Sequence, residues 1–134
     1  MENGMHEVSV MSSIIESVLE ELKKYNVEKV EEVHLTIGEM TFLGEDQLSF
    51  AFEILSKGTL LEGSQLIIGH EDAEVKCRSC QYQGAPDRLD DEIYHSSMPT
   101  LNCPKCGRGV ELTKGKSCLV RSVKVVEADV PVQG

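Results

Sequence analysis

Two pairs of cysteines, Cys77–Cys80 and Cys103–Cys106, have the spacing Cys-x-x-Cys and are separated by 22 residues. A Cys-x-x-Cys turn directs two sulfurs at one point, and two such turns can form a tetrahedral cage of four thiolates. Gly107 follows the second pair, and Cys-Pro-x-Cys-Gly is typical of a tight metal-binding knuckle. The sequence therefore predicts a structural zinc site at Cys77, Cys80, Cys103 and Cys106, with a single iron as the alternative ion.

The predicted cage indicates a protein that holds this metal without using it in catalysis. Four thiolates fill the coordination sphere of zinc and leave no open position for a substrate. The segment between the pairs is mostly polar, so the metal replaces a hydrophobic core there. The sequence also has no Ser/His/Asp arrangement and no glycine-rich phosphate-binding loop, and we expect that the protein is not an enzyme.

A second candidate for metal chemistry is His6, between Met5 and Glu7. Most histidines near a chain terminus are simply exposed to solvent. An imidazole in this position can, however, combine with backbone nitrogens to offer several nitrogen donors in one plane. Planar nitrogen coordination suits Ni(II) or Cu(II) and does not suit zinc.

Composition limits the partners and the compartment. The 134 residues carry a formal net charge of −10, and a negative field repels phosphate backbones, so we expect no nucleic-acid partner. No stretch approaches the roughly 20 apolar residues of a membrane span. The N-terminus does not resemble a signal peptide. We therefore expect a cytoplasmic protein without a membrane partner, in which paired cysteines bind metal and do not form disulfides.

Hydrophobic periodicity predicts two helices and a small sheet. Residues 7–25 and 45–57 repeat apolar side chains at helical spacing, and residues 30–38 alternate as a half-buried strand does. The apolar positions of the first helix are Val8, Met11, Ile14, Ile15, Val18, Leu19 and Leu22, and those of the second are Leu48, Phe50, Ala51, Phe52, Ile54 and Leu55. A further extended run begins near residue 66 and continues to the first cysteine.

The last predicted strand, from about 117 to 127, contains a change of phase. Cys118 and Val120 alternate, as do Val123 and Val125, but the two pairs are out of register. A bulge near residues 121–122 would put all four on one face, and Cys118 would then serve as a small buried side chain, with a redox or ligand role as the alternative.

The predicted fold class is α+β: a small sheet with two helices packed on one face, plus an inserted zinc-ribbon-like module with four cysteines. We expect residues 1–75 and 110–134 to form the α+β domain and residues 76–109 to form the zinc-binding module.

Several segments together resemble one family. They are Met5–Glu7, Val33–Glu39, Phe50–Glu53, Gly58–Thr59, Glu62–Gly63, both cysteine pairs, Gly115–Lys116 and Ser122–Val125. In this order and with these spacings, the chain from residue 5 to about residue 127 resembles the HypA/HybF family of hydrogenase nickel-insertion proteins.

The resemblance implies a nickel metallochaperone that delivers Ni(II) to the large subunit of NiFe hydrogenase during maturation. It implies that His6 is the nickel ligand, with Glu7 contributing its backbone amide or its carboxylate, and that the four cysteines hold structural zinc. The implied partners are a nickel-handling GTPase of the HypB type and the hydrogenase large subunit, and urease maturation factors are a further candidate.

One departure from the family pattern affects the nickel site. The family motif begins at the initiator methionine, whose free amine can bind nickel, whereas residues 1–4 precede Met5 here. Either translation starts at Met5, which we favour, or the chelate uses amides and other side chains. His95, between the cysteine pairs, is a candidate additional nickel ligand, with an exposed loop histidine as the alternative. His34 and His70 have no neighbour in the sequence that would make them ligands.

Two other functions remain open. A zinc-ribbon interaction module, which docks nucleic acid or protein without transferring nickel, would share the cage; the negative charge and the lack of a basic, aromatic patch disfavour nucleic acid. An iron electron carrier of the rubredoxin kind would share Cys-Pro-x-Cys-Gly, but it fits poorly with two helices and a 22-residue gap.

Overall fold

The computed structural model describes residues 2–91 and 96–128. The helices are α1 (Glu2–Leu22), the short 3-10 helix η1 (Glu39–Thr41) and α2 (Glu45–Leu55). The strands are β1 (Val27–Gly38), β2 (Gln65–Glu71), β3 (Glu74–Lys76), β4 (Gln83–Gly84), β5 (Arg88–Asp91), β6 (Ser96–Pro99), β7 (Glu111–Lys114) and β8 (Cys118–Glu127). The chain forms two compact units, of residues 1–36, 43–69 and 119–134, and of residues 37–42 and 70–118.

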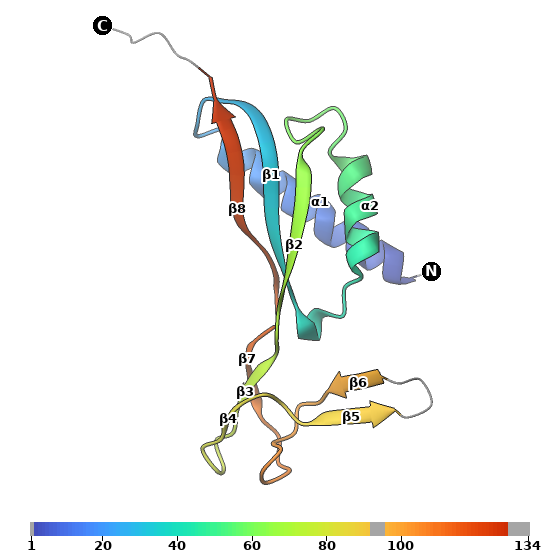
Figure 1. Ribbon diagram of the computed structural model, residues 1–134, viewed down its shortest axis with the longest axis vertical. Helices are drawn as coiled ribbons and strands as arrows, with labels where there is room; N and C mark the ends of the chain where they lie inside the picture. The colour runs from blue at the N-terminus through green and yellow to red at the C-terminus, as the bar shows by residue number, and fades with distance from the viewer. Residues whose placement is uncertain (1, 92–95, 129–134) are drawn as a thin grey trace, which may run out of the picture. The chain divides into compact units, whose positions relative to one another are not determined.

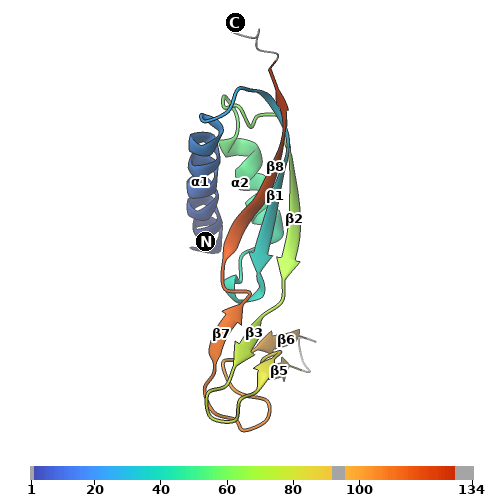
Figure 2. The same cartoon turned by 90° about the vertical axis from the view of Figure 1, so that its left-hand side faces the viewer.

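The first unit is the predicted sheet with two helices. Its strands lie in the order β2-β1-β8, and α1 and α2 both cover one face of this sheet (Figures 1 and 2). Strand β1 alternates between buried and more exposed side chains because only one of its faces meets the helices. The buried core draws on both helices and on β1, and includes Met11, Ile15, Val18, Leu22, Val30, Val33, Leu35, Leu48, Ala51 and Phe52. The α+β prediction is confirmed.

Helix α1 is displaced toward the N-terminus relative to the prediction of 7–25. It begins at Glu2, so Met5–Glu7 lies inside the helix and not ahead of it. It ends at Leu22, where the backbone N–H groups of Lys24 and Tyr25 bond to carbonyl groups three residues back. Periodicity placed the start at the first apolar position, and a polar first turn carries no such signal.

Strand β8 confirms the predicted change of phase. Cys118, Val120, Val123 and Val125 are all half-buried, and the intervening residues are exposed, with two consecutive exposed positions at 121–122. Cys118 is a free thiol. Burial raises the pKa of Cys118, which disfavours the reactive thiolate.

The second unit contains a β4-β3-β7 sheet, the antiparallel strand pair β5–β6 and the short helix η1. The extended run expected from residue 66 to the cysteines is interrupted at residues 72–73, between β2 and β3. Two segments of the chain meet closely at this break, since a Cβ added to Gly115 would lie 2.8 Å from Ala73 Cα. Gly115 also has a φ of +79°, so both its space and its backbone favour glycine.

None of the described helices combines the length and hydrophobicity that a membrane span requires.

Candidate metal centres

The two cysteine pairs lie on two loops with the same backbone geometry. In the first loop the N–H of Cys77 donates to the Tyr82 carbonyl at 2.8 Å, and the N–H of Gln81 donates to the Cys77 carbonyl at 3.0 Å. In the second loop Cys103 N–H donates to the carbonyl of residue 108 at 2.7 Å, and the N–H of residue 107 donates to the Cys103 carbonyl at 2.8 Å. Each first cysteine thus bonds across its own turn, and the two knuckles present their sulfurs in the same way.

Each knuckle requires one residue in the left-handed region. Gly107 takes this position in the second knuckle with a φ of +76°, as expected for a glycine that follows Cys-Pro-x-Cys. In the first knuckle the equivalent position is Gln81, with a φ of +67°. The sequence signal for a knuckle was therefore strong in one pair and hidden in the other.

The four sulfurs form one cluster. All four lie within 4.8 Å of one another. The Sγ atoms of Cys77 and Cys106 are 3.6 Å apart, and those of Cys80 and Cys103 are 3.5 Å apart. A tetrahedral zinc with Zn–S bonds of about 2.3 Å places its sulfurs about 3.8 Å apart. The cage therefore fits a structural zinc ion, as the spacing predicts. The first cysteine of each pair is buried and the second is exposed.

Backbone N–H groups around the cage stabilise negative charge on the buried sulfurs. Bonds from the N–H groups of Cys80 and Ser79 hold the pKa of Cys77 at about 6, although burial opposes this. Burial raises the pKa of the Cys103 thiol, but the N–H groups of Cys106 and Lys105, together with the thiols of Cys80 and Cys106, outweigh burial and lower the pKa. These two sulfurs are the ones most ready to bind a cation.

The remaining thiols show why the cage needs a metal. The N–H of Tyr82 lowers the pKa of Cys80, but the neighbouring thiols of Cys103, Cys77 and Cys106, together with burial, raise it to about 11. Four adjacent thiolates cannot all be ionised without a cation among them. A divalent ion in the centre removes this obstacle and deprotonates the coordinating thiols outright.

His6, the predicted nickel ligand, lies on α1 with an exposed side chain. The described residues provide no hydrogen-bond or ion-pair partner for its imidazole, which therefore has both ring nitrogens free for a metal. His34 instead contacts Glu32, with 2.9 Å between Nε2 and Oε1, and His70 is an exposed residue of β2. His95 lies outside the described residues. Within residues 2–91 and 96–128, only the four cysteines form a ready cluster of metal ligands.

The Glu7 carboxylate points into the protein, unlike the neighbouring imidazole. The side chain is only 3% exposed, and Oε2 accepts a hydrogen bond of 2.7 Å from the N–H of Gly44, the N-cap residue of α2. Its second oxygen, Oε1, is buried and has no hydrogen-bond partner among the residues that the structure describes. The sequence did carry a signal for this burial, since Glu7 lies four residues before Met11 on the apolar side of α1.

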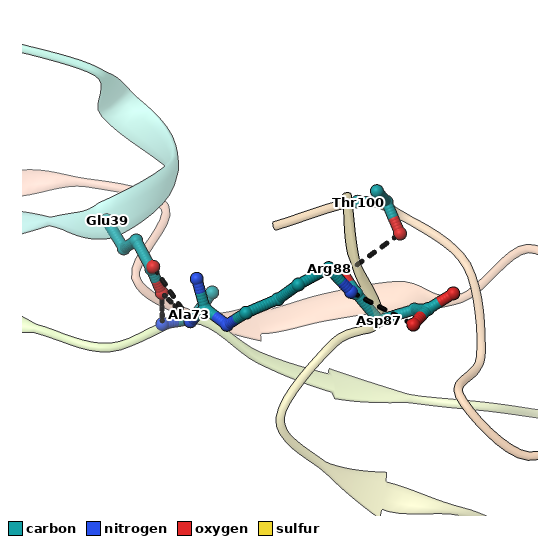
Figure 3. Close-up of polar contacts among 5 residues, drawn as sticks. All are labelled: Glu39, Ala73, Asp87, Arg88 and Thr100. Atoms are coloured by element: carbon teal, nitrogen blue, oxygen red, sulfur yellow. Dashed lines mark hydrogen bonds and ion pairs between the residues drawn. The ribbon is translucent and has the colours of Figure 1, made fainter. Parts of the chain in front are cut away.

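A second carboxylate with a structural position was not foreseen. Glu39, in η1, accepts a hydrogen bond from the N–H of Ala73 at 2.9 Å and pairs with Arg88 of β5, at 2.8 Å between Oε2 and the guanidinium (Figure 3). The N–H of Ala73 and, after it, Arg88 lower the pKa of Glu39 despite partial burial. Glu39 therefore connects three segments of the second unit.

The fold and the cage define a small α+β metal-binding protein in which a four-cysteine site has the dimensions of structural zinc. The chain belongs to the family described as hydrogenase/urease nickel incorporation, metallochaperone, HypA, which matches residues 5–125.

Curated relatives and solved structures support this assignment. The hydrogenase maturation factor HypA of Methanopyrus kandleri is 38% identical, over 90% of this chain and 93% of its own. The hydrogenase maturation factor HypA of Methanocaldococcus jannaschii is 34% identical, over 93% of this chain and 100% of its own. The solution structure of the Ni metallochaperone HypA from Helicobacter pylori matches with a TM-score of 0.66 at 28% identity, over 91% of this chain and 98% of that one. The resemblance drawn from the sequence motifs is confirmed.

Proposed function

We propose that this protein is a nickel carrier that binds Ni(II) through His6 at the start of α1 and passes it to the large subunit of NiFe hydrogenase. The observation that carries the proposal is the exposed imidazole of His6, which has no hydrogen-bond or ion-pair partner among the described residues, in a chain whose family incorporates nickel. A carrier must release its ion, and a site on a helix end is labile in a way that a closed four-ligand cage is not.

The remaining parts of the proposal follow from this role. Zinc in the four-cysteine cage stays in place and supports the module of residues 76–109, while residues 1–75 and 110–134 handle nickel. A nickel-handling GTPase of the HypB type and the hydrogenase large subunit are the partners, with urease maturation factors as further candidates. The protein works as a carrier and not as a catalyst, in the cytoplasm, where a reducing environment keeps the thiols free.

Helix α1 sets a condition on nickel binding. In an α-helix only the first four N–H groups lack a partner four residues back. Because α1 begins at Glu2, the N–H groups of His6 and Glu7 fall within the hydrogen-bonded part of the helix. A planar site that uses these amide nitrogens therefore requires the first turns of α1 to open, which costs little at a helix end.

A calorimetric nickel titration of the zinc-loaded protein tests the proposal. We expect about one high-affinity Ni(II) per chain, its loss in His6→Ala, and its retention in His70→Ala, which removes another exposed histidine. Circular dichroism in the same titration should show the loss of about four to six residues of helix. Stoichiometric binding that survives unchanged in His6→Ala would refute the site.

A further inference from the structure

The two knuckles carry positive charge in a strongly acidic chain. Residues 76–86 and 102–110 contain four of the 13 basic residues and none of the 23 acidic ones. We use the name knuckle surface for the four cationic side chains and the one aromatic ring of these segments, namely Lys76, Arg78, Lys105, Arg108 and Tyr82. The charge of this surface is opposite in sign to that of the chain as a whole.

The cage brings the two halves of the knuckle surface together. The sulfur contacts of 3.5 and 3.6 Å each join one cysteine of the first knuckle to one of the second. Across this junction the Nζ of Lys105 lies 5.7 Å from the centre of the Tyr82 ring, a cation–π distance. Both views show the two loops side by side beyond β3 and β7 (Figures 1 and 2). The two knuckles that carry the cations are therefore adjacent in the fold although 22 residues separate the motifs.

Four thiolates and one divalent zinc give the cage a formal charge of about −2, which the four cationic side chains of the knuckle surface outweigh. Lys76, Lys105 and Arg108 are exposed, and no carboxylate of the described residues pairs with them. Arg78 contacts Glu111 at 3.3 Å, but its side chain is 83% exposed and that of Glu111 is 55% exposed. An ion pair in such a solvated position is weak, so it leaves the guanidinium available to a competing carboxylate.

We propose that the knuckle surface is a docking site for a short acidic segment of a partner protein. Two guanidinium groups can each hold a carboxylate with paired hydrogen bonds, and the ammonium groups add point charges beside them. Acidic residues flank the two segments at Glu74, Asp87 and Glu111, and Glu111 contacts Arg78. A long polyanion such as nucleic acid would meet these carboxylates, whereas a short acidic loop or helix end would not. The zinc ion fixes the two knuckles, so metal loading is a condition for docking.

The test uses the full-length, zinc-loaded protein and a fluorescently labelled oligoglutamate peptide of about ten residues, followed by anisotropy at about 50 mM and about 200 mM salt. We expect the triple variant Arg78→Ala/Lys105→Ala/Arg108→Ala to bind this peptide about tenfold or more weakly than the unaltered protein. The matched control is Lys23→Ala/Lys24→Ala/Lys29→Ala, which removes the same charge from exposed positions of the first unit and should change affinity by about twofold or less.

Three results would overturn the proposal: no binding of the peptide at low salt, equal losses in the two triple variants, or tighter binding of a single-stranded oligonucleotide of equal length than of the peptide. The last result would identify a nucleic-acid surface instead. Zinc content is measured for every variant. If the triple variant loses zinc, Arg108→Glu decides, because the Arg108 side chain is exposed and forms no ion pair with the described residues. This variant should retain zinc and bind several-fold more weakly, and unchanged affinity would again refute the proposal.

Discussion

The carboxylate of Glu7 accepts a hydrogen bond of 2.7 Å from the backbone N–H of Gly44, and so joins the beginning of α1 to the beginning of α2. The negative group lies where the dipole of α2 is positive, and it satisfies a donor that α2 itself leaves unpaired. A side chain at Gly44 would crowd this contact, because a Cβ there would lie 3.2 Å from Oε2 of Glu7. The residue next to the proposed nickel ligand thus has a position in the hydrophobic interior.

Replacement of Glu7 should distinguish a structural role of this residue from a role in metal binding. We expect Glu7→Ala to lower the free energy of unfolding by about 1–3 kcal/mol, because the part-buried N–H of Gly44 loses its acceptor. Glu7→Gln keeps a carbonyl oxygen for this N–H and should cost clearly less. Urea unfolding of the zinc-loaded proteins measures both values, and equal losses would contradict the assigned hydrogen bond.

The close crossing of Gly115 and Ala73 gives a second prediction for stability. Gly115→Ala adds a Cβ that would lie 2.8 Å from backbone atoms and also strains a positive φ, so we expect a loss well above 1 kcal/mol, roughly 2–4 kcal/mol. Gly63→Ala is the matched control, since φ is +83° there but no atom lies within 4 Å of the added Cβ. It should cost only about 1 kcal/mol. Thermal unfolding compares the two, and similar losses would mean that the crossing is not tight.

The pair of Glu39 and Arg88 should show a defined dependence on pH. The pKa of Glu39 is lowered from its ordinary value of 4.5. The contribution of the ionised Glu39 to the stability of the fold is therefore fully present above pH 4.5. The contribution is lost as pH falls through the lower pKa of the folded state. A double-mutant cycle of Glu39→Gln and Arg88→Ala should give a coupling of about 0.5–1 kcal/mol at neutral pH. The coupling should vanish in strong acid, and a coupling that grows on acidification would contradict the pairing.

Zinc retention should fall on acidification. Protons compete with zinc for the thiolates, and the pKa of about 6 at Cys77 without metal is lowered further by a bound ion. We therefore expect full retention at neutral pH and progressive release as the pH is lowered into the acid range. Dialysis at stepped pH followed by a colorimetric zinc assay measures this. Cys103→Ser should lose zinc at neutral pH, whereas Cys118→Ser, which alters the free thiol outside the cage, should retain it.

A shortened chain that begins at Met5 should bind nickel more tightly than the chain with residues 1–4. A free amine is a better donor than a neutral amide, and removal of the first helical residues reduces the hydrogen bonds that nickel binding must break. We expect a gain of about tenfold, or about 1.4 kcal/mol, in calorimetric titrations. Acetylation of the new terminus should abolish most of the gain. Equal affinities for the two chains would show that the amine is not a ligand.

The elements that the sequence predicted best are those with local signals. The cage followed from two Cys-x-x-Cys motifs, and the helix stripe from Met11 to Leu22 is buried as its spacing required. The change of phase in β8 was also readable, because two runs of alternation in one strand can share a face only if the register shifts between them. The start of α1 could not be predicted in this way, because its first turn is polar.

The sequence by itself determined the four-cysteine cluster, the two amphipathic helices and the family, because each depends on residues near one another in the chain or on the order of short motifs. Only the tertiary structure decided where the remaining polar groups act. Glu7 meets Gly44 across 37 residues and Glu39 meets Arg88 across 49. No periodicity relates such partners, because a hydrogen bond between distant segments exists only after the core has brought the segments together.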